Sequence, residues 1–326
     1  MKLWLAGLCL GIATALSGNA EPLPTTNRLT LIVVVGAPGE AEFGSNFVQQ
    51  ASLWEAAGQQ AGGERITLGQ ETDPPTNDAE GLRLALAAQP KTGTEALWLV
   101  LIGHGTFDGK EARFNLRGPD VSATNLAQWL QPFQRPLVVI NTASASAPFL
   151  NRLSATNRVI VAATRSGYEQ NFARFGQFIA EAIASPESDL DQDGQTSLLE
   201  AFLAASRRVA EFYQTAGRLA TEHALIDDNG DGLGTPADWF RGTRAIKRAA
   251  DGAALDGVRA QQFQLVRSAE EQQLPPAIRA QRDELELAVA GLRDRKAELS
   301  EVEYYRQLES LLLDLSRLYE RGVSKP

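Results

Sequence analysis

Five short apolar segments constrain the fold of this chain more than any other feature of its sequence. They cover residues 29–35, 96–102, 137–140 and 159–163, with a weaker segment at 65–68. Each is apolar on both faces and is followed by small or turn-forming residues, which is typical of buried parallel strands. Helical stretches lie between them, at residues 45–60, 77–88, 124–130 and 148–154. This alternation predicts an α/β fold in which helices cover both faces of a mostly parallel sheet.

The amino terminus has the pattern of a secretory signal peptide. Lys2 precedes an apolar run at residues 3–16, and Gly18-Asn19-Ala20 offers small residues at the cleavage positions. We therefore expect residues 1–20 to be removed near Ala20/Glu21 and the mature chain to be periplasmic or secreted. No second long apolar segment follows, so no membrane span is expected after cleavage. The only cysteine, Cys9, lies in this signal segment, and the mature chain therefore has no thiol.

The net charge of −9 argues against a nucleic-acid partner, because such partners select basic surfaces. After the α/β domain, expected at residues 27–184, the pattern indicates a calcium-binding helical region at 185–250 and a linker at 251–275. Residues 276–326 then repeat apolar side chains in two seams with heptad-like spacing. The seams are formed by Ile278, Leu285, Leu292 and Leu299, and by Tyr305, Leu308, Leu312, Leu315 and Tyr319. They predict an antiparallel helical hairpin or one long helix, which either packs on its own domain or joins copies of the chain.

An acidic stretch that begins at Asp189 is the most specific chemical motif. Oxygen-bearing side chains fall at positions 1, 3, 5, 9 and 12 of a twelve-residue loop, from Asp189, Asp191, Asp193, Ser197 and Glu200. Gly194 falls at position 6, where an EF-hand loop turns sharply, and Gln195 can offer its carbonyl at position 7. Because Ca²⁺ prefers six to eight oxygen ligands, the motif predicts a calcium loop between helices at residues 171–184 and 198–213. The alternative is an acidic turn without metal.

A second acidic stretch begins at Asp227. Oxygen donors at positions 1, 3 and 5 come from Asp227, Asn229 and Asp231, and position 12 is Asp238. Aspartate is shorter than the glutamate usual at position 12 and is less suited to bidentate binding. The stretch is either a second calcium-holding turn or a solvated Asn-Gly/Asp-Gly turn.

Two strand ends carry residues of catalytic type. One predicted strand runs into Gly103-His104-Gly105, and the next runs into Asn141-Thr142-Ala143-Ser144. Functional groups of parallel sheets gather at this edge. With these motifs, residues 29–184 resemble the legumain- and caspase-like cysteine peptidases. The resemblance extends to the segment at residues 159–167, and bacterial relatives also have an Asp-rich loop after the last strand.

The resemblance implies that His104 is the general base and that the nucleophile position falls on Ala143. A methyl group cannot attack a carbonyl, so the resemblance implies the fold without the activity. His104 would then be a vestigial, structural histidine. The alternative is an active hydrolase of the same fold that uses Ser144 or Ser146 with His104.

These features together predict an exported, calcium-binding pseudo-peptidase. Its role would be to bind or scaffold an unidentified protein or peptide ligand. The binding surface would be the former substrate cleft or the C-terminal hairpin. Self-association through that hairpin is a further expectation. In a rival hypothesis the hairpin carries the function, and the α/β domain only supports it structurally.

Overall fold

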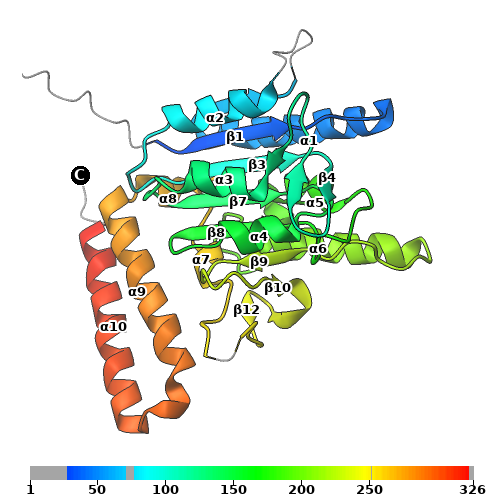
Figure 1. Cartoon of the computed structure of the whole chain (residues 1–326). Coiled ribbons are helices and arrows are strands. Elements are labelled where there is room, and N and C mark those ends of the chain that lie inside the picture. The colour runs from blue at the N-terminus through cyan, green and yellow to red at the C-terminus, as the bar shows by residue number, and fades with distance from the viewer. Residues whose placement is uncertain (1–27, 71–76, 251, 323–326) are drawn as a thin grey trace, which may run out of the picture.

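A seven-stranded sheet lies at the centre of the chain, whose computed structural model describes residues 28–70, 77–250 and 252–322 (Figure 1). Its strands are β1 (Thr30–Val35), β2 (Glu64–Leu68), β3 (Leu97–Ile102), β7 (Leu137–Asn141), β8 (Arg158–Ala162), β9 (Leu225–Asp227) and β10 (Thr235–Pro236). The spatial order is β10-β9-β8-β7-β3-β1-β2. The predicted signal peptide, residues 1–20, lies outside the described residues.

The five strands predicted from the apolar segments pair in parallel, as expected. β1 lies between β2 and β3, and β7 joins β3 to β8. Every residue of β1, β3 and β7 is buried, which explains why these segments are apolar on both faces. The antiparallel strands β9 and β10 extend the sheet beyond β8, and the sequence does not predict them. They have three and two residues, too few for an alternating pattern.

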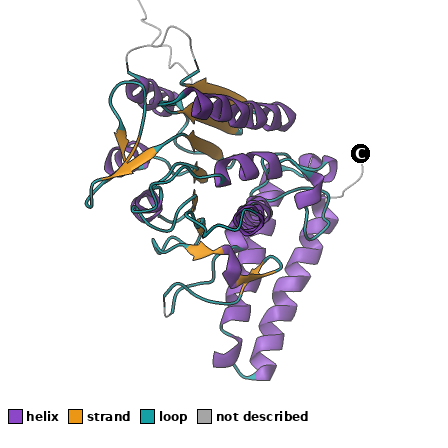
Figure 2. Cartoon of the chain, turned by 90° about the vertical axis from the view of Figure 1, so that its right-hand side faces the viewer, coloured by secondary structure: helices purple, strands orange, loops and turns teal. Residues whose placement is uncertain are grey.

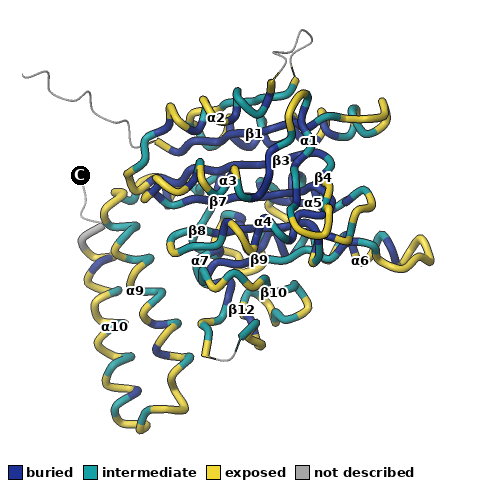
Figure 3. Tube along the Cα trace, viewed as in Figure 1, coloured by how far each residue is buried: buried dark blue, intermediate teal, exposed yellow. Residues whose placement is uncertain are grey.

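Helices cover both faces of the sheet, which confirms the predicted α/β class. One face is covered by α1 (Ala41–Ala61), α5 (Phe175–Ala182) and α6 (Leu198–Thr215), and the other by α2 (Asp78–Ala88), α3 (Ala123–Leu130) and α4 (Ala147–Leu153). Large side chains such as Trp54 and Phe149 fill the two interfaces. Figure 3 shows the central strands as the most continuously buried part of the chain. Each helix predicted in this region is present within a few residues of its expected bounds.

Short elements complete the body of the chain. β4 (Gly105–Phe107), β5 (Ala112–Phe114) and β6 (Val121–Ser122) form a small sheet whose Phe114 packs in the core. The other elements are the 3₁₀ turns η1 (Pro186–Ser188) and η2 (Ala237–Trp239), and the strand pair β11 (Phe240–Arg241) and β12 (Arg244–Ala245). The segment from 185 to 250 therefore contributes strands as well as helix to the α/β body.

The C-terminal part forms an antiparallel helical hairpin, one of the two predicted arrangements. After α7 (Val258–Gln261) and α8 (Ala269–Gln273) come α9 (Pro276–Asp294), η3 (Lys296–Glu298) and α10 (Glu301–Gly322). The Ser300 hydroxyl accepts a hydrogen bond from the Glu303 amide at 3.3 Å, so it caps α10. Figures 1 and 2 show the hairpin extending away from the sheet as an arm. Among the described helices, none combines the length and apolar character that crossing a bilayer requires.

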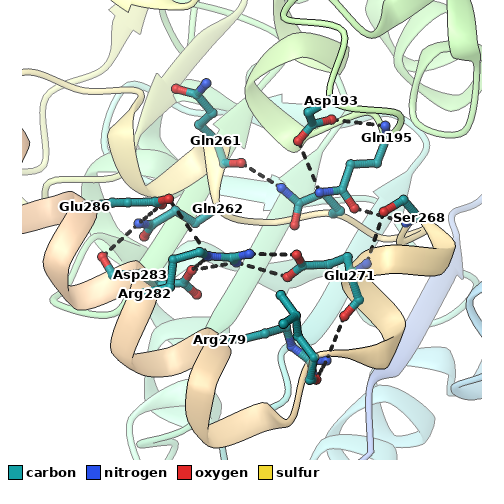
Figure 4. A network of polar contacts seen from close by, with 12 residues as sticks. Asp193, Gln195, Gln261, Gln262, Ser268, Glu271, Arg279, Arg282, Asp283 and Glu286 are labelled. Atoms are coloured by element: carbon teal, nitrogen blue, oxygen red, sulfur yellow. Dashed lines mark hydrogen bonds and ion pairs between the residues drawn. The ribbon is translucent and has the colours of Figure 1, made fainter. Parts of the chain in front are cut away.

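Charged side chains hold the root of this arm on the body. The carboxylate of Glu95, next to β3, accepts hydrogen bonds from Arg267 at 2.7 Å and from Arg279 at 2.5 Å. Burial raises the pKa of Glu95, but the two guanidinium groups outweigh it and the net pKa is lowered. Arg282 of α9 makes a two-pronged contact with Glu271 of α8, and Figure 4 shows this network at the arm root. The arm is therefore attached by ion pairs that are largely shielded from water.

Candidate functional site

His104 lies at the carboxyl end of β3, where the sequence places it. Its ring packs edge-on against Phe43 and Phe47 of α1, with centroid separations of 4.8 and 5.1 Å. Its Nε2 lies 3.2 Å from the carbonyl oxygen of Pro38. The ring is therefore held by aromatic packing and by a backbone carbonyl. No described carboxylate orients it, as a hydrolytic base would require.

Ala143 follows β7 at the neighbouring strand end, and only 1% of it is exposed. Its methyl group belongs to the hydrophobic core beneath α3 and α4. Ser144, the next residue, is also buried, and its hydroxyl donates to the Gly105 carbonyl at 3.0 Å. The same oxygen accepts from the Gly105 amide at 3.1 Å. The hydroxyl of Ser144 thus joins two strand ends and is not hydrogen-bonded to His104.

Ser146 is fully buried and has a similar structural role. Its hydroxyl lies 3.2 Å from the hydroxyl of Thr164 and accepts from the Thr164 amide at 3.2 Å. Ala145, between the two serines, has a φ of 53°, which a residue with a side chain rarely adopts. Its amide donates to the Glu169 carbonyl at 2.7 Å, which helps to hold this conformation. Among the described residues, the structure does not bring either serine into a catalytic contact with His104.

The structure adds one acid–base pair that the sequence does not predict at this edge. Nδ1 of His223 lies 2.6 Å from Oε1 of Glu169, and the His223 amide donates to Oε2 of the same carboxylate. Arg165 also contacts Glu169, at 3.2 Å. The two partners are 54 residues apart in sequence, and no local pattern links them. The pair ties the segment before β9 to the loop after β8.

The acidic turn from Asp189 to Asp193 places three carboxylates together. One oxygen from each of Asp189, Asp191 and Asp193 lies within 4.8 Å of the others. Partial burial, and repulsion from Asp191 and Asp189, raise the pKa of Asp193 despite hydrogen bonds from Gln195. A cation would relieve this repulsion, and carboxylate oxygens are the ligands that hard divalent ions prefer. The residues present therefore fit a metal ion.

Glu200, predicted at position 12, lies at the start of α6 and is almost fully buried. Its Oε1 accepts from the amides of Leu190 and Asp191 at 2.7 and 3.1 Å. Its Oε2 accepts from both the amide and the hydroxyl of Ser197, each at 2.8 Å. The carboxylate therefore joins the two ends of the loop and caps α6. Its oxygens do not belong to the cluster formed by the three aspartates.

The turn also contacts the segment that leads to the arm. Gln261 donates from its amide group to Asp191 at 3.0 Å, and the Ser268 amide donates to the Gln195 side chain at 3.0 Å. Ser197 pairs with Gln264 in an isolated antiparallel bridge. The predicted helices on each side are present as α5 and α6. The loop is thus bridged to a segment of its own chain far along the sequence, and the second acidic stretch takes no part in this bridge.

The second acidic stretch has a different arrangement. Asp227 is buried, and its two oxygens accept from the amides of Gly230 and Gly232 at 2.9 and 3.0 Å. Asn229 accepts from the Asp231 amide at 2.8 Å, and Asp238 is exposed in η2. Among the described residues, no three acidic groups of this stretch converge as a metal cluster. Its side chains instead stabilise the turn between β9 and β10.

A buried pair of aspartates lies beside this second turn. Asp256 accepts from the Asp228 amide at 3.0 Å and from the Thr235 hydroxyl at 2.6 Å. Asp228 in turn accepts from the amides of Gly257 and Ala260 at 2.9 and 2.7 Å. Burial, followed by repulsion from Asp228, raises the pKa of Asp256 to about 8. The pair fastens the segment before α7 to the turn after β9.

Comparison with known proteins gives distant structural likenesses only. No family model matches the sequence, and no curated protein does. The crystal structure of the Drosophila initiator caspase Dronc is 14% identical, covers 63% of this chain and 80% of Dronc, and has a TM-score of 0.43. Caspase-1 from Spodoptera frugiperda is 11% identical, covers 62% of this chain and 86% of its own, and has a TM-score of 0.42.

A third solved structure belongs to protein GSU0716 from Geobacter sulfurreducens. It is 11% identical, covers 55% of this chain and 88% of its own, and has a TM-score of 0.39. Likenesses at this distance concern the arrangement of helices and strands. They carry no information about catalysis, ligands or partners. The α/β class rests on the chain's own sheet, and its chemistry must be argued from its own side chains.

Proposed function

We propose that this chain is an exported, calcium-binding protein without peptidase activity, whose role is to bind or scaffold other polypeptides. The observation that supports it best is the convergence of Asp189, Asp191 and Asp193 on a turn that contacts the arm segment. A hard cation there would stabilise a loop that links the α/β body to the helical arm. Calcium suits the oxygen-only donor set and an extracellular location, where this ion is abundant.

The absence of peptidase activity follows from the strand ends. Ala143 has no nucleophilic atom, and the hydroxyls of Ser144 and Ser146 are buried in hydrogen bonds to Gly105 and Thr164. His104 lacks an orienting acid among the described residues. A serine hydrolase needs the nucleophile, base and acid in one hydrogen-bonded series. The hydrolase alternative would require this edge to rearrange, and no observation favours that.

Calorimetric titration tests the metal part of the proposal. Calcium is expected to bind the purified mature protein, and Asp189→Ala should remove the heat of binding. Asp238→Ala is the matched control, because it removes an exposed aspartate outside the cluster. Absence of heat with millimolar calcium, or equal loss in both variants, would show that the acidic turn holds no ion.

Hydrolysis assays and thiol labelling test the non-enzymatic part. The wild-type protein should not cleave a mixed peptide library, and His104→Ala should make no difference. Ala143→Cys places a thiol in the core, so alkylation should be slow in the folded protein and complete in urea. Peptide cleavage by the wild-type protein that His104→Ala removes would overturn this part. The two experiments are independent, so metal binding and inactivity can fail separately.

A further inference from the structure

A large groove runs between the helical arm and the body of the chain. Its volume is about 1330 Å³, above the roughly 300–1,000 Å³ usual for small-molecule pockets. The arm contributes Val289, Leu312 and Tyr319 to one wall, and the body contributes Leu255 and Val258 to the other. The lining thus combines apolar side chains from both walls with many polar and charged ones. Its size suits a segment of polypeptide better than a metabolite.

The arm keeps apolar surface in this groove that the hairpin does not need for its own packing. Tyr304 and Leu318 of α10 are the residues buried within the hairpin. Leu312 and Tyr319 lie one heptad apart, line the groove, and remain 50% and 43% exposed. An amphipathic helix commonly binds such a helix-lined groove through side chains spaced three, four and seven residues apart. Packing within the hairpin therefore leaves part of the second apolar seam, which the sequence predicts from Tyr305 to Tyr319, exposed.

The two ends of the groove carry opposite charge. Arg244 and Arg293 line it towards the tip of the arm, and neither has an acidic partner among the described residues; Asp294, which also lines this end, is paired with Arg248 at 3.7 Å. Glu270 and Glu286 line it near the arm root, beside the aspartate cluster. Arg282 is shared at this end: it makes a two-pronged contact with Glu271 and lies 3.9 Å from Glu286, so the negative charge there comes mainly from Glu270, Asp191 and Asp193 (Figure 4). The groove is therefore complementary to a segment with charges of opposite sign at its two ends.

We propose that this groove binds an amphipathic helical segment of a partner protein, acidic at its amino-terminal end and basic at its carboxyl-terminal end. Its acidic end would lie against Arg244 and Arg293, and its basic end against Glu270 and Glu286. This charge order is the one that favours helix formation itself, since acids stabilise helix amino termini and bases carboxyl termini. The segment would run parallel to α10. From Arg282 to Arg293 the groove follows α9 for about 16 Å at 1.5 Å per residue, which is three turns of helix.

A phage-displayed library of random dodecapeptides tests this proposal on the full-length mature protein. Enriched peptides should share an apolar stripe with helical spacing, acidic residues near the amino terminus and basic residues near the carboxyl terminus. Ala290→Trp fills the groove from α9 and should abolish the enrichment. The double variant Arg293→Glu with Glu270→Lys should select the reversed charge order. Arg295→Glu is the control, because Arg295 is exposed on the same arm outside the groove.

A labelled peptide from the selection should bind the Arg293→Glu protein at least tenfold more weakly and the Arg295→Glu protein equally well. Circular dichroism of each variant shows whether the fold is kept. The peptide selection is done once with calcium present and once with a chelator. Peptide binding can then be assessed separately from metal binding. The proposal fails if no peptide is enriched over the Ala290→Trp protein, or if charge reversal leaves the pattern unchanged. It also fails if sedimentation shows that Ala290→Trp abolishes a dimer, since the occupant is then a second copy.

Discussion

The two acidic turns have the same spacing of oxygen donors but differ in whether their carboxylates converge. In the first, Asp189, Asp191 and Asp193 direct oxygens to a common, largely exposed position. In the second, Asp227 is buried and both of its oxygens are held by backbone amides. Its position-12 residue, Asp238, lies on the surface. The first turn therefore offers a cation three converging carboxylates, whereas no such acidic cluster forms at the second turn among the described residues.

The comparison teaches that donor spacing alone does not define a metal loop. A carboxylate that accepts two backbone amides already has its charge stabilised, and a metal must displace those donors. The first turn bears the same cost at its first position, because the two oxygens of Asp189 accept from the amides of Asp193 and Gly194 at 3.2 and 2.9 Å. The two turns differ in convergence instead, because Asp191 and Asp193 each bring a carboxylate oxygen within 4.8 Å of one from Asp189. The first turn is also supported from its far end by Glu200, whose carboxylate accepts the hydrogen bonds that hold the loop in shape.

The largest expected effect comes from removing that support. Glu200→Ala should lower the free energy of unfolding by about 3 kcal/mol, because a buried carboxylate with four donors is lost and those donors are left unsatisfied. Urea unfolding measures it. Glu187→Ala, an exposed glutamate in the preceding turn, should change stability by less than about 0.5 kcal/mol. Equal effects would mean that Glu200 does not support the first turn.

Calcium should separate the two turns directly. At a hundredfold excess over its dissociation constant, calcium should stabilise the wild-type protein by about 2.7 kcal/mol, because it binds only the folded loop. Asp191→Asn with Asp193→Asn should remove this gain, and Asp231→Asn in the second turn should keep it. Thermal unfolding with and without calcium is the measurement. Loss of the gain in the second-turn variant would reverse the assignment of the two turns.

The buried aspartate pair beside the second turn should give the protein a characteristic pH dependence. The pKa of Asp256 is raised from 3.8 to about 8, so the folded state holds a proton that the unfolded state releases. Stability from this group is complete below pH 3.8 and is lost as the pH rises towards about 8. The free energy of unfolding is expected to fall by about 2 kcal/mol between pH 5 and pH 8. Release of one proton limits this fall to about 1.4 kcal/mol for each pH unit. In Asp256→Asn the urea midpoint should vary less over this range, and an unchanged slope would contradict the shift.

The smallest effect is expected at the last predicted ligand of the second turn. Asp238→Ala should alter stability by less than about 0.5 kcal/mol, since the side chain is exposed and makes no described ion pair. The calcium-induced rise in melting temperature should also stay the same. A clear loss of calcium response would instead give the second turn a metal-binding role that its geometry does not indicate.

Much of the fold could be predicted because its strands are continuous apolar runs. β1, β3, β7 and β8 lie within two residues of their predicted bounds, and the helices between them follow from amphipathic spacing. β9 and β10 could not be predicted, because their strand conformation depends on pairing with β8. The hairpin was predictable from its heptad spacing, and in the structure Ser300 caps its second helix.

The candidate sites were predictable only where they are local. The spacing from Asp189 to Asp193 places three carboxylates on one turn, so the cluster follows from sequence. The partners of that turn do not, because Gln261 and Ser268 lie about 70 residues further along the chain. The groove depends on how the arm is placed against the body, and the Glu169–His223 pair depends on tertiary contacts. No local pattern encodes these features.

The position of Glu95 also has a consequence for the order of folding. Its two arginine partners lie 172 and 184 residues further along the chain. Contacts of such long range close large loops and therefore form late, after local elements and their neighbours have assembled. A chain that emerges from its amino terminus would complete the sheet before Arg267 and Arg279 become available. Until then Glu95 lacks the two guanidinium groups that lower its pKa, so the docking of the arm is the step that adds these ion pairs to the assembled body.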